Sequence, residues 1–266
     1  MNDLAPPAST VGIVTDSNSQ FPAALIERYG IEVVPLTVTV DGTAYAEGID
    51  LDADDFFARY ARGGSPEVST AAPAPGAFVE AYARLAAAGA EQILSIHIGS
   101  TVSGTLESAR VAAAQSPVPV RLVDTGTASF GVACCVWEAA EALRSGATAG
   151  EAAEIAEATA PTVGNVFVVG ALDIVRAGGR LAEGVDIDDA GAVDGVPVLS
   201  LIGGKVTPVG AVADVADATG AMVERVIAAG EGLRVAVGIA DAGAEPLSSA
   251  LIARLSTEPA VKEVVL

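Results

Sequence analysis

The sequence predicts an α/β protein with two α/β domains, the first of them a mainly parallel, doubly wound sheet. Short apolar, β-branched runs alternate with helical patterns over residues 11–160, which is typical of a parallel sheet covered by helices. The alternation restarts beyond Pro161. With 266 residues, the chain is long enough for two small domains. We therefore expect an N-terminal domain over residues 1–161 and a C-terminal domain over residues 162–266.

The elements of the first domain follow from apolar periodicity and from glycine and proline positions. Strands are expected over 11–15, 31–40, 43–46, 91–98 and 119–123, and helices over about 22–29, 52–62, 76–88, 103–115, 128–145 and 149–160. Asp41-Gly42 predicts a two-residue hairpin turn. Asp52 is the expected cap of its helix. Residues 66–75, with three prolines, are expected to form a loop that carries Ser69 and Thr70.

The second domain shows the same kinds of signal. Strands are expected over 165–170, 196–202, 205–208 and 233–240, with a last strand from 261, and helices over 171–176, about 214–229 and 246–255. Gly203-Gly204 predicts a second hairpin turn.

Composition narrows the classes of function. A net charge of −20 argues against nucleic acid and anionic membrane surfaces as partners. No apolar run reaches the roughly 18 residues of a membrane span, and the N-terminus lacks a signal-peptide pattern, so a cytoplasmic location is expected. One histidine and the adjacent Cys134 and Cys135 give no metal-binding pattern. Both cysteines are expected to be buried, and neither a metal nor a cofactor is predicted.

The stretch IGSTVSGTLESA, residues 98–109, places hydroxyls and glycines between a predicted strand and a predicted helix. Backbone N–H groups at a helix start, together with the hydroxyls of Ser100, Ser103 and Thr105, suit a single carboxyl group held without a cationic side chain. Gly99 lets a ligand approach the backbone. Ordinary helix capping by Ser103 is the alternative, and for Thr70 the alternative is a turn stabilised by its own hydroxyl.

Asp16 and His97 are the candidates for catalysis, and for each a structural role is the preferred interpretation. An acid after a first strand more often caps a helix or ties loops together. The only histidine lies in an apolar strand, which is typical of a core residue. The chain has no G-x-S-x-G elbow and no P-loop. No catalytic residue is therefore predicted.

Six separated motifs together resemble one family. They are GIVTDSNSQFP, IEVVPLTVTVDGTAYAEG, STAAPAPGAF, IGSTVSGTLESA, VRLVDTGTASFGVA and DIVRAGGRL. In order and spacing they resemble the DegV family of bacterial fatty-acid-binding proteins, strongly over residues 11–180 and loosely over 196–266.

The resemblance implies a non-catalytic carrier that presents a long-chain fatty acid to a fatty acid kinase, which phosphorylates the carboxylate. It implies an acyl chain buried in the first domain with its carboxyl group near the domain junction. The carboxyl-binding threonine and serine of the family fall on Thr70 and Ser100. Phe78, Tyr82 and Leu85 share one face of helix 76–88, which makes this helix a candidate wall of the acyl pocket.

The chain departs from the family pattern in three places. The family usually ends with a His-x-Gly-Pro-Gly segment, whereas this sequence stops at Leu266 and its C-terminal segment is expected to be shortened. An acidic stretch, AEGVDIDDAGAVDG, replaces an apolar helical one. The run GAVADVADA, with Ala213, stands near the position where the family often has a basic stretch with an arginine used towards the kinase. Two alternatives stay open: an α/β enzyme acting on a small carboxylic acid or ester, and a degenerate member with a partner-binding role.

Overall fold

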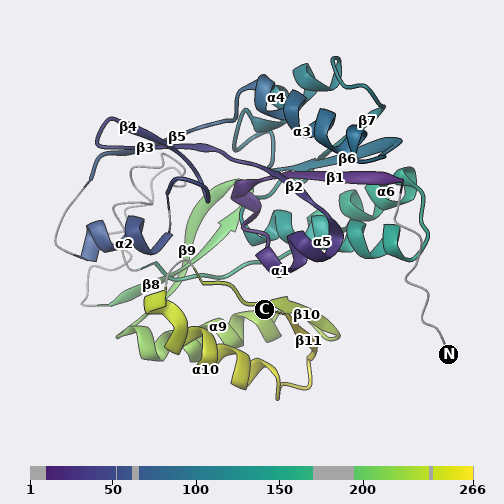
Figure 1. The fold of residues 1–266 in the computed structure, drawn as a ribbon. Coiled ribbons are helices and arrows are strands. Elements are labelled where there is room, and N and C mark those ends of the chain that lie inside the picture. The colour runs from purple at the N-terminus through teal and green to yellow at the C-terminus, as the bar shows by residue number, and fades with distance from the viewer. Residues whose placement is uncertain (1–9, 52, 62–65, 170–194, 240–241, 266) are drawn as a thin grey trace. The chain divides into compact units, whose positions relative to one another are not determined.

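The computed structural model describes residues 10–51, 53–61, 66–169, 195–239 and 242–265 (Figure 1). Residue contacts divide the chain into two compact units. Unit 1 comprises Met1–Thr37 and Ala71–Val163, and unit 2 comprises Val38–Thr70 and Gly164–Leu266. The chain thus passes between the units near residues 37, 70 and 163.

Unit 1 is built on a four-stranded sheet in the order β2-β1-β6-β7, in which every neighbouring pair is parallel. Its strands are β1 (Val11–Asp16), β2 (Glu32–Val34), β6 (Gln92–His97) and β7 (Val120–Asp124). Its helices are α1 (Ala23–Tyr29), α3 (Pro75–Ala87), α4 (Thr105–Ala113), α5 (Phe130–Arg144) and α6 (Ala149–Thr159), with one-turn helices η1 (Ser17–Ser19) and η2 (Ala160–Thr162). The predicted doubly wound parallel sheet is confirmed.

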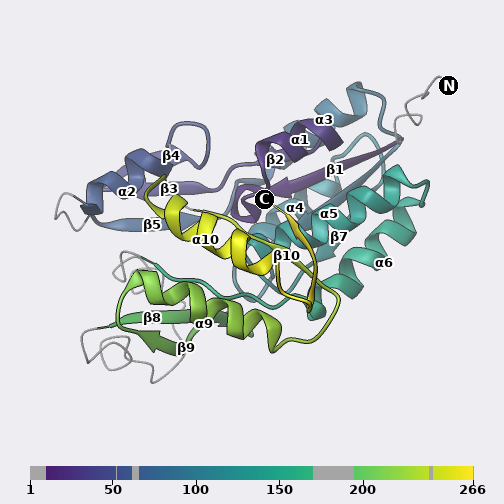
Figure 2. The same cartoon turned by 90° about the horizontal axis from the view of Figure 1, so that it is seen from below.

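Each face of this sheet has its own core, because side chains alternate between the faces along a strand. Ile13, Leu94 and Ile96 belong to the core shared with α5 and α6, which pack against each other (Figure 2). Val14 and Ile93 belong to the other core, which contains the buried face of α3. In sequence order, Asp16 therefore follows Val14 onto the α3 side, and Ser95 and His97 follow Ile93 there.

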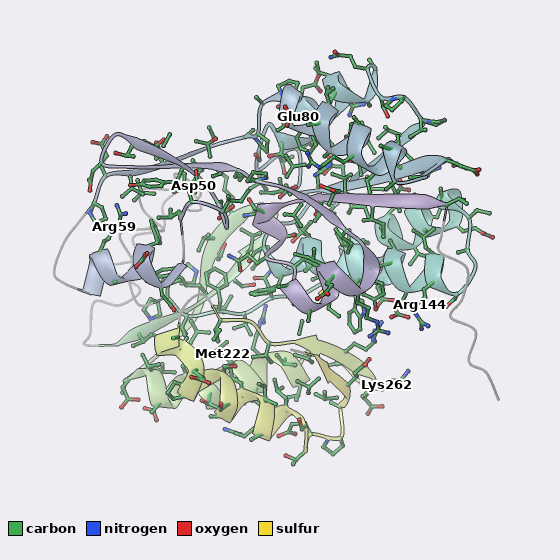
Figure 3. All side chains as sticks on the ribbon, in the orientation of Figure 1. Asp50, Arg59, Glu80, Arg144, Met222 and Lys262 are labelled. Carbon is green, nitrogen blue, oxygen red and sulfur yellow. The ribbon has the colours of Figure 1, made fainter. Side chains whose placement is uncertain are left out.

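The described part of unit 2 contains three small sheets. Its strands are β3 (Thr37–Val40), β4 (Thr43–Ala46), β5 (Val68–Ala71), β8 (Val196–Ile202), β9 (Lys205–Val212), β10 (Leu233–Ala236) and β11 (Val261–Val265). They form a β4-β3-β5 sheet, an antiparallel β8-β9 pair and a parallel β10-β11 pair. Its helices are α2 (Ala53–Ala61), α9 (Val215–Ile227) and α10 (Glu245–Leu255), with the one-turn η3 (Ala242–Ala244). Met222 of α9 points into the core, whereas Lys262 of β11 is exposed (Figure 3).

The contacts divide the chain differently from the single boundary near residue 161. Segment Val38–Thr70, which falls within the predicted first domain, belongs to unit 2. This segment has its own sheet and a small core around Val38, Val40 and Leu51, and Asp54 of its helix accepts from the Ala242 N–H at 2.9 Å, a contact within unit 2.

Three predicted elements differ from the structure. The expected strand over 165–170 forms, in its described residues 165–169, only the isolated bridge of Phe167 to Leu199. The expected strand over 31–40 is two strands in different sheets, β2 and β3, with Pro35 and Leu36 between them. Proline lacks an N–H for a ladder bond, and the Leu36 N–H donates to the Ser17 hydroxyl at 2.8 Å instead. The expected loop over 66–75 contains strand β5, which carries Thr70 at the edge of its sheet.

Other predictions are confirmed by the backbone. The β3-β4 hairpin turns at Asp41 and Gly42, which both have positive φ angles, 49° and 79°. Cys135 is fully buried in α5, and Cys134 is partly buried. Burial, with a smaller contribution from Cys134, raises the pKa of Cys135 to about 12. The expected cap Asp52 and the expected helix 171–176 lie outside the described residues.

Candidate functional site

The parallel strands of unit 1 end at one edge, with Asp16 closing β1, His97 closing β6 and Asp124 closing β7. From β1 the sheet grows to β2 on one side and to β6 and β7 on the other. In open α/β sheets, ligands bind outside the carboxyl ends of the strands where the order reverses in this way. The loop between β6 and α4, residues 98–104, follows β6 at this point.

Hydrogen bonds lock this loop to the segment that follows β7. Gly99 N–H donates to the Thr127 carbonyl at 2.8 Å, and the Thr125 hydroxyl donates to the His97 carbonyl at 2.8 Å. A Cβ on Gly99 would lie 2.7 Å from the carbonyl carbon of Gly126, so only glycine fits without moving the backbone. The close approach that requires glycine here is therefore to the chain itself. Its predicted contact with a ligand stays a prediction.

Ser100 is exposed and is bound to Asp124 through two groups. Its N–H donates to Asp124 Oδ1 at 3.0 Å, and its hydroxyl donates to Asp124 Oδ2 at 2.5 Å. Partial burial raises the pKa of the Asp124 carboxyl, but hydrogen bonds from Ser100 and from the Gly126 N–H outweigh burial and hold that pKa below its ordinary value. Ser100 thus presents a hydroxyl and an N–H to the carboxylate of Asp124, and its predicted contact with a ligand stays a prediction.

Ser103 does not act as the N-cap that sequence offered as its alternative role. The N-cap of α4 is Gly104, with no side-chain cap hydrogen bond. The Ser103 hydroxyl accepts from the Thr105 N–H at 3.3 Å and pairs with the Thr105 hydroxyl at 2.9 Å. Since two hydroxyls share one hydrogen bond, the pair retains one O–H for another acceptor. Thr105 is fully buried.

Thr70 lies in β5 of unit 2, where it is exposed, whereas Gly99, Ser100 and Ser103 share one loop of unit 1. The structure therefore brings three of the four predicted ligand-binding residues together on one segment. Convergence of Thr70 with Ser100 stays a prediction.

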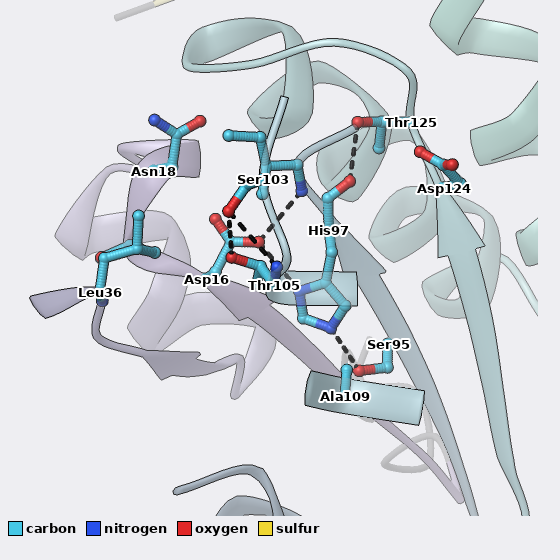
Figure 4. Close-up of polar contacts among 12 residues, drawn as sticks. Asp16, Asn18, Leu36, Ser95, His97, Ser103, Thr105, Ala109, Asp124 and Thr125 are labelled. Atoms are coloured by element: carbon cyan, nitrogen blue, oxygen red, sulfur yellow. Dashed lines mark hydrogen bonds and ion pairs between the residues drawn. The ribbon is translucent and has the colours of Figure 1, made fainter. Parts of the chain in front are cut away.

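A buried polar row crosses the α3 side of the sheet (Figure 4). His97 Nδ1 lies 2.9 Å from Asp16 Oδ2, and His97 Nε2 lies 2.6 Å from the Ser95 hydroxyl. The Ser95 hydroxyl lies 3.0 Å from the Tyr82 hydroxyl. All four side chains are fully buried. His97 is therefore a satisfied core histidine, as the sequence predicts, and Asp16 ties β1 to β6.

The hydrogen bonds of this row connect four side chains in sequence. Burial, partly offset by the bond to Ser95, raises the pKa of Tyr82 to about 12, so its hydroxyl keeps its proton, which lies within reach of both the Ser95 hydroxyl and the Ala109 carbonyl, 3.4 Å away. Ser95 then donates to His97 Nε2, and His97 Nδ1–H donates to Asp16. This is the connectivity of a Ser-His-Asp triad. The Ser95 hydroxyl is nevertheless buried beneath Tyr82, where a substrate has no access.

One oxygen of Asp16 is left over. Oδ2 accepts from His97 and, at 3.1 Å, from the Ile98 N–H, whereas Oδ1 is buried and has no hydrogen-bond partner among the described residues. The hydroxyls of Thr15 and Ser19 are in the same condition. A buried acceptor without a donor is unfavourable and marks a place that a ligand or a water could complete.

Sequence reasoning named Thr105 among the hydroxyl donors of this loop but missed Asp124 and the row linking Tyr82 to Asp16. The signals were partly present. Asp124 ends a predicted strand, where polar residues at ligand sites occur, and Ser95 and His97 are two apart in an otherwise apolar strand, which places them on one face. Contact with Tyr82, on a separate helix, has no local signal.

The described ranges lack both a metal-binding cluster and a membrane-spanning helix. They contain no group of three or more His, Cys, Asp or Glu side chains that could hold a metal ion. None of the helices described there is both long enough and apolar enough to span a bilayer.

Comparison with known proteins gives a single family. A sequence profile described as "Uncharacterised protein, DegV family" matches residues 10–265. A DegV domain-containing protein of Streptomyces coelicolor is 36% identical over 245 residues, covering 92% of this chain and 86% of the relative. A DegV domain-containing protein of Deinococcus radiodurans is 34% identical over 254 residues, covering 93% and 88%.

Solved structures agree with these relatives. A structure described as fatty acid binding of a DegV family protein from Thermus thermophilus is 29% identical, with a TM-score of 0.79 and coverage of 96% of this chain and 91% of that one. DegV from Bacillus subtilis, described as a fatty acid binding protein, shares the fold at 24% identity, with a TM-score of 0.76 and coverage of 96% and 91%.

Proposed function

The chain belongs to the DegV family, and we propose that it binds a long-chain fatty acid as a non-catalytic carrier. The observation that carries this proposal is its similarity, over 96% of its length, to the Thermus thermophilus protein whose structure concerns fatty acid binding. The hydroxyl-bearing loop at the carboxyl ends of β1 and β6 supports it, because ligands of such sheets bind at that edge.

The carboxyl group is held by hydroxyl side chains. Ser100 and Ser103 donate from the β6–α4 loop, Thr70 donates from β5, and the Gly99 backbone lies beside the head group. Ser100 exchanges its hydrogen bond with Asp124 for one with the ligand. The Ser103–Thr105 pair has an O–H to donate without losing its internal bond.

The acyl tail supplies most of the affinity. Each buried CH₂ contributes about 0.8 kcal/mol, so a long chain reaches micromolar binding after association costs. Helix α3 stays the candidate wall of the pocket in unit 1. Its Phe78 and Tyr82 side chains are fully buried against the sheet, so a tail on this face requires one of them to change rotamer.

Carrier function, rather than catalysis, fits the burial of the Ser95–His97–Asp16 row. Delivery to an acyl kinase is the finer part of the proposal. Ala213 near the position of the family's arginine suggests a weaker or altered kinase contact. A cytoplasmic location, where such a carrier would meet its kinase, belongs to the same proposal.

Identification of co-purifying lipid tests the proposal most directly. Native mass spectrometry and lipid extraction of the purified protein should give a species of fatty-acid mass. A protein that carries no lipid and does not bind added hexadecanoic acid contradicts the proposal. A saturable esterase activity that is lost in His97→Gln would support the enzyme alternative instead.

Head-group contacts are tested by removing single hydroxyls. Thr70→Val or Ser100→Ala should weaken binding of a fluorescent fatty acid about ten- to hundredfold, because an acceptor of the buried head group left without its donor costs about 1–3 kcal/mol. Thr207→Val in β9 and Ser256→Ala after α10 are matched controls, since neither residue is among those proposed to hold the head group. Unchanged affinity in both test variants, or melts lowered enough to explain the loss, would remove the two residues from the site.

A further inference from the structure

Asp16 presents a buried acceptor that no described residue satisfies, at the edge of the sheet where the ligand head group is proposed to bind. Its Oδ1 has no partner, and the whole side chain is inaccessible. Its other oxygen accepts from the N–H of Ile98, the first residue after β6. The Ser103 N–H in turn donates to the Gly99 carbonyl at 3.1 Å, so residues 99–103 form a tight turn directly after the residue that is bound to Asp16.

The direction of this oxygen is fixed by its neighbours. Oδ2 is held by Ile98 N–H and His97 Nδ1, and the imidazole is held at its other nitrogen by Ser95. Phe78 packs edge-on against the His97 ring, with 5.1 Å between the ring centroids. Because rotation of the carboxyl group would break two hydrogen bonds, Oδ1 cannot turn to find a partner within the core.

The close-up shows the hydroxyls of Ser103 and Thr105 and the Asp16 carboxyl at the carboxyl ends of β1 and β6 (Figure 4). The site therefore offers two complementary groups. The hydroxyl pair has one O–H left to donate, and Asp16 Oδ1 has a lone pair left to accept. A ligand head that carries both one acceptor and one donor satisfies both.

A neutral carboxylic acid is such a head, whereas a carboxylate only accepts. Two carboxyl groups at hydrogen-bonding distance cannot both be ionised without strong repulsion, so they share one proton. We propose that the protein binds its fatty acid in the neutral acid form, with the ligand O–H donating to Asp16 Oδ1. This inference rests on the proposed fatty-acid function and makes Asp16 a selector of head groups that donate a hydrogen bond.

Carbon NMR of a labelled ligand reads the protonation state directly. Hexadecanoic acid labelled with ¹³C at the carboxyl carbon is ionised in water at neutral pH. Bound to the full chain at neutral pH, its carbon should resonate at the position of a neutral acid. In Asp16→Asn, where an amide N–H₂ replaces the acceptor, the bound signal should move to the carboxylate position. Asp214→Asn exchanges the N-cap of α9 for another good cap and should leave the signal at the neutral position.

A head-group series keeps the test independent of whether Asp16→Asn folds. Hexadecanamide has a donor and an acceptor at every pH, and methyl hexadecanoate has acceptors only. The unmodified protein should bind the amide at least about tenfold more tightly than the ester, since the ester leaves Asp16 unpaired. Equal binding of amide and ester would overturn the inference.

The remaining outcomes separate the two proposals. A bound signal at the carboxylate position in the unmodified protein overturns the neutral-acid inference and leaves fatty-acid binding intact. A neutral position retained in a folded Asp16→Asn also overturns it, because the proton would then be held elsewhere. No bound signal in any of the proteins would instead contradict the proposed function.

Discussion

The two faces of the unit 1 sheet are built from the same strands, yet they bury different chemistry. On the α5 side, β1 and β6 contribute Ile13, Leu94 and Ile96 to an apolar core. On the α3 side, the same two strands contribute Asp16, Ser95 and His97 beside the apolar Val14 and Ile93 (Figure 4).

This difference indicates which face of the sheet has a role beyond the stability of the fold. An apolar core is sufficient to hold a sheet to its helices, and replacement of buried ionic groups by apolar ones is often neutral or stabilising. The polar row is therefore not explained by stability alone. It ends at Asp16, beside the loop that carries Ser100 and Ser103, which fits a role in holding that carboxyl group in place.

The largest expected effect comes from breaking the polar row at its end. Asp16→Ala leaves the Ile98 N–H and His97 Nδ1–H buried without an acceptor and should lower the free energy of unfolding by about 3–5 kcal/mol. Urea denaturation measures it. Asp214→Ala, which removes an exposed helix cap, should cost only about 1 kcal/mol. Equal losses in the two variants would show that the buried row contributes no more to the free energy of unfolding than an exposed helix cap does.

The apolar face should respond through packing only. Leu94→Ala removes a fully buried side chain between β6 and its helices and should lower the free energy of unfolding by about 2–5 kcal/mol. Fatty-acid affinity, measured well below the melting temperature, should be unchanged. A tenfold loss of affinity would mean that the tail lies on this face, which would reverse the comparison.

A milder change removes one hydroxyl from the polar row and keeps its ring. Tyr82→Phe should lower the free energy of unfolding by about 0.5–1.5 kcal/mol at neutral pH. Because the pKa of Tyr82 is raised to about 12 in the folded protein, its contribution is present below the unfolded value of about 10 and is lost as pH rises towards 12. The stability difference between the two proteins should therefore shrink over that alkaline range, and a constant difference would contradict this account.

The smallest effect is expected at the exposed edge of the loop. The pKa of Asp124 is lowered in the folded protein, so its contribution is present above the unfolded pKa of about 3.9 and is lost as pH falls through the folded pKa. Asp124→Asn should flatten the acid side of the stability curve slightly, as followed by melts in a pH series. If the two proteins lose stability identically as the pH falls, the exposed contact of Asp124 with Ser100 makes no measurable contribution to stability.

Local patterns in the sequence account for most of the architecture. Alternating apolar runs and helical faces predict the parallel sheet, and Asp41-Gly42 predicts its hairpin because positive φ angles favour these residues there. The hydroxyl-rich stretch after β6 predicts a carboxyl-binding loop, and this function stays a prediction. His97 is recognisable as a core residue because it lies within an apolar strand. Each of these signals depends on neighbours within a few residues.

Tertiary structure alone decided what those segments meet. The division of 31–40 into β2 and β3 depends on Ser17, which accepts the Leu36 N–H from nineteen positions away. The membership of Val38–Thr70 in unit 2 reflects contacts with residues far along the chain. The contact of Asp16 with His97 joins residues 81 positions apart, and the Ser100 N–H donates to Asp124, which lies 24 positions further along the chain. Spacing within one strand or helix cannot encode such pairs, because the sheet order that brings them together is set by the packing of the whole unit.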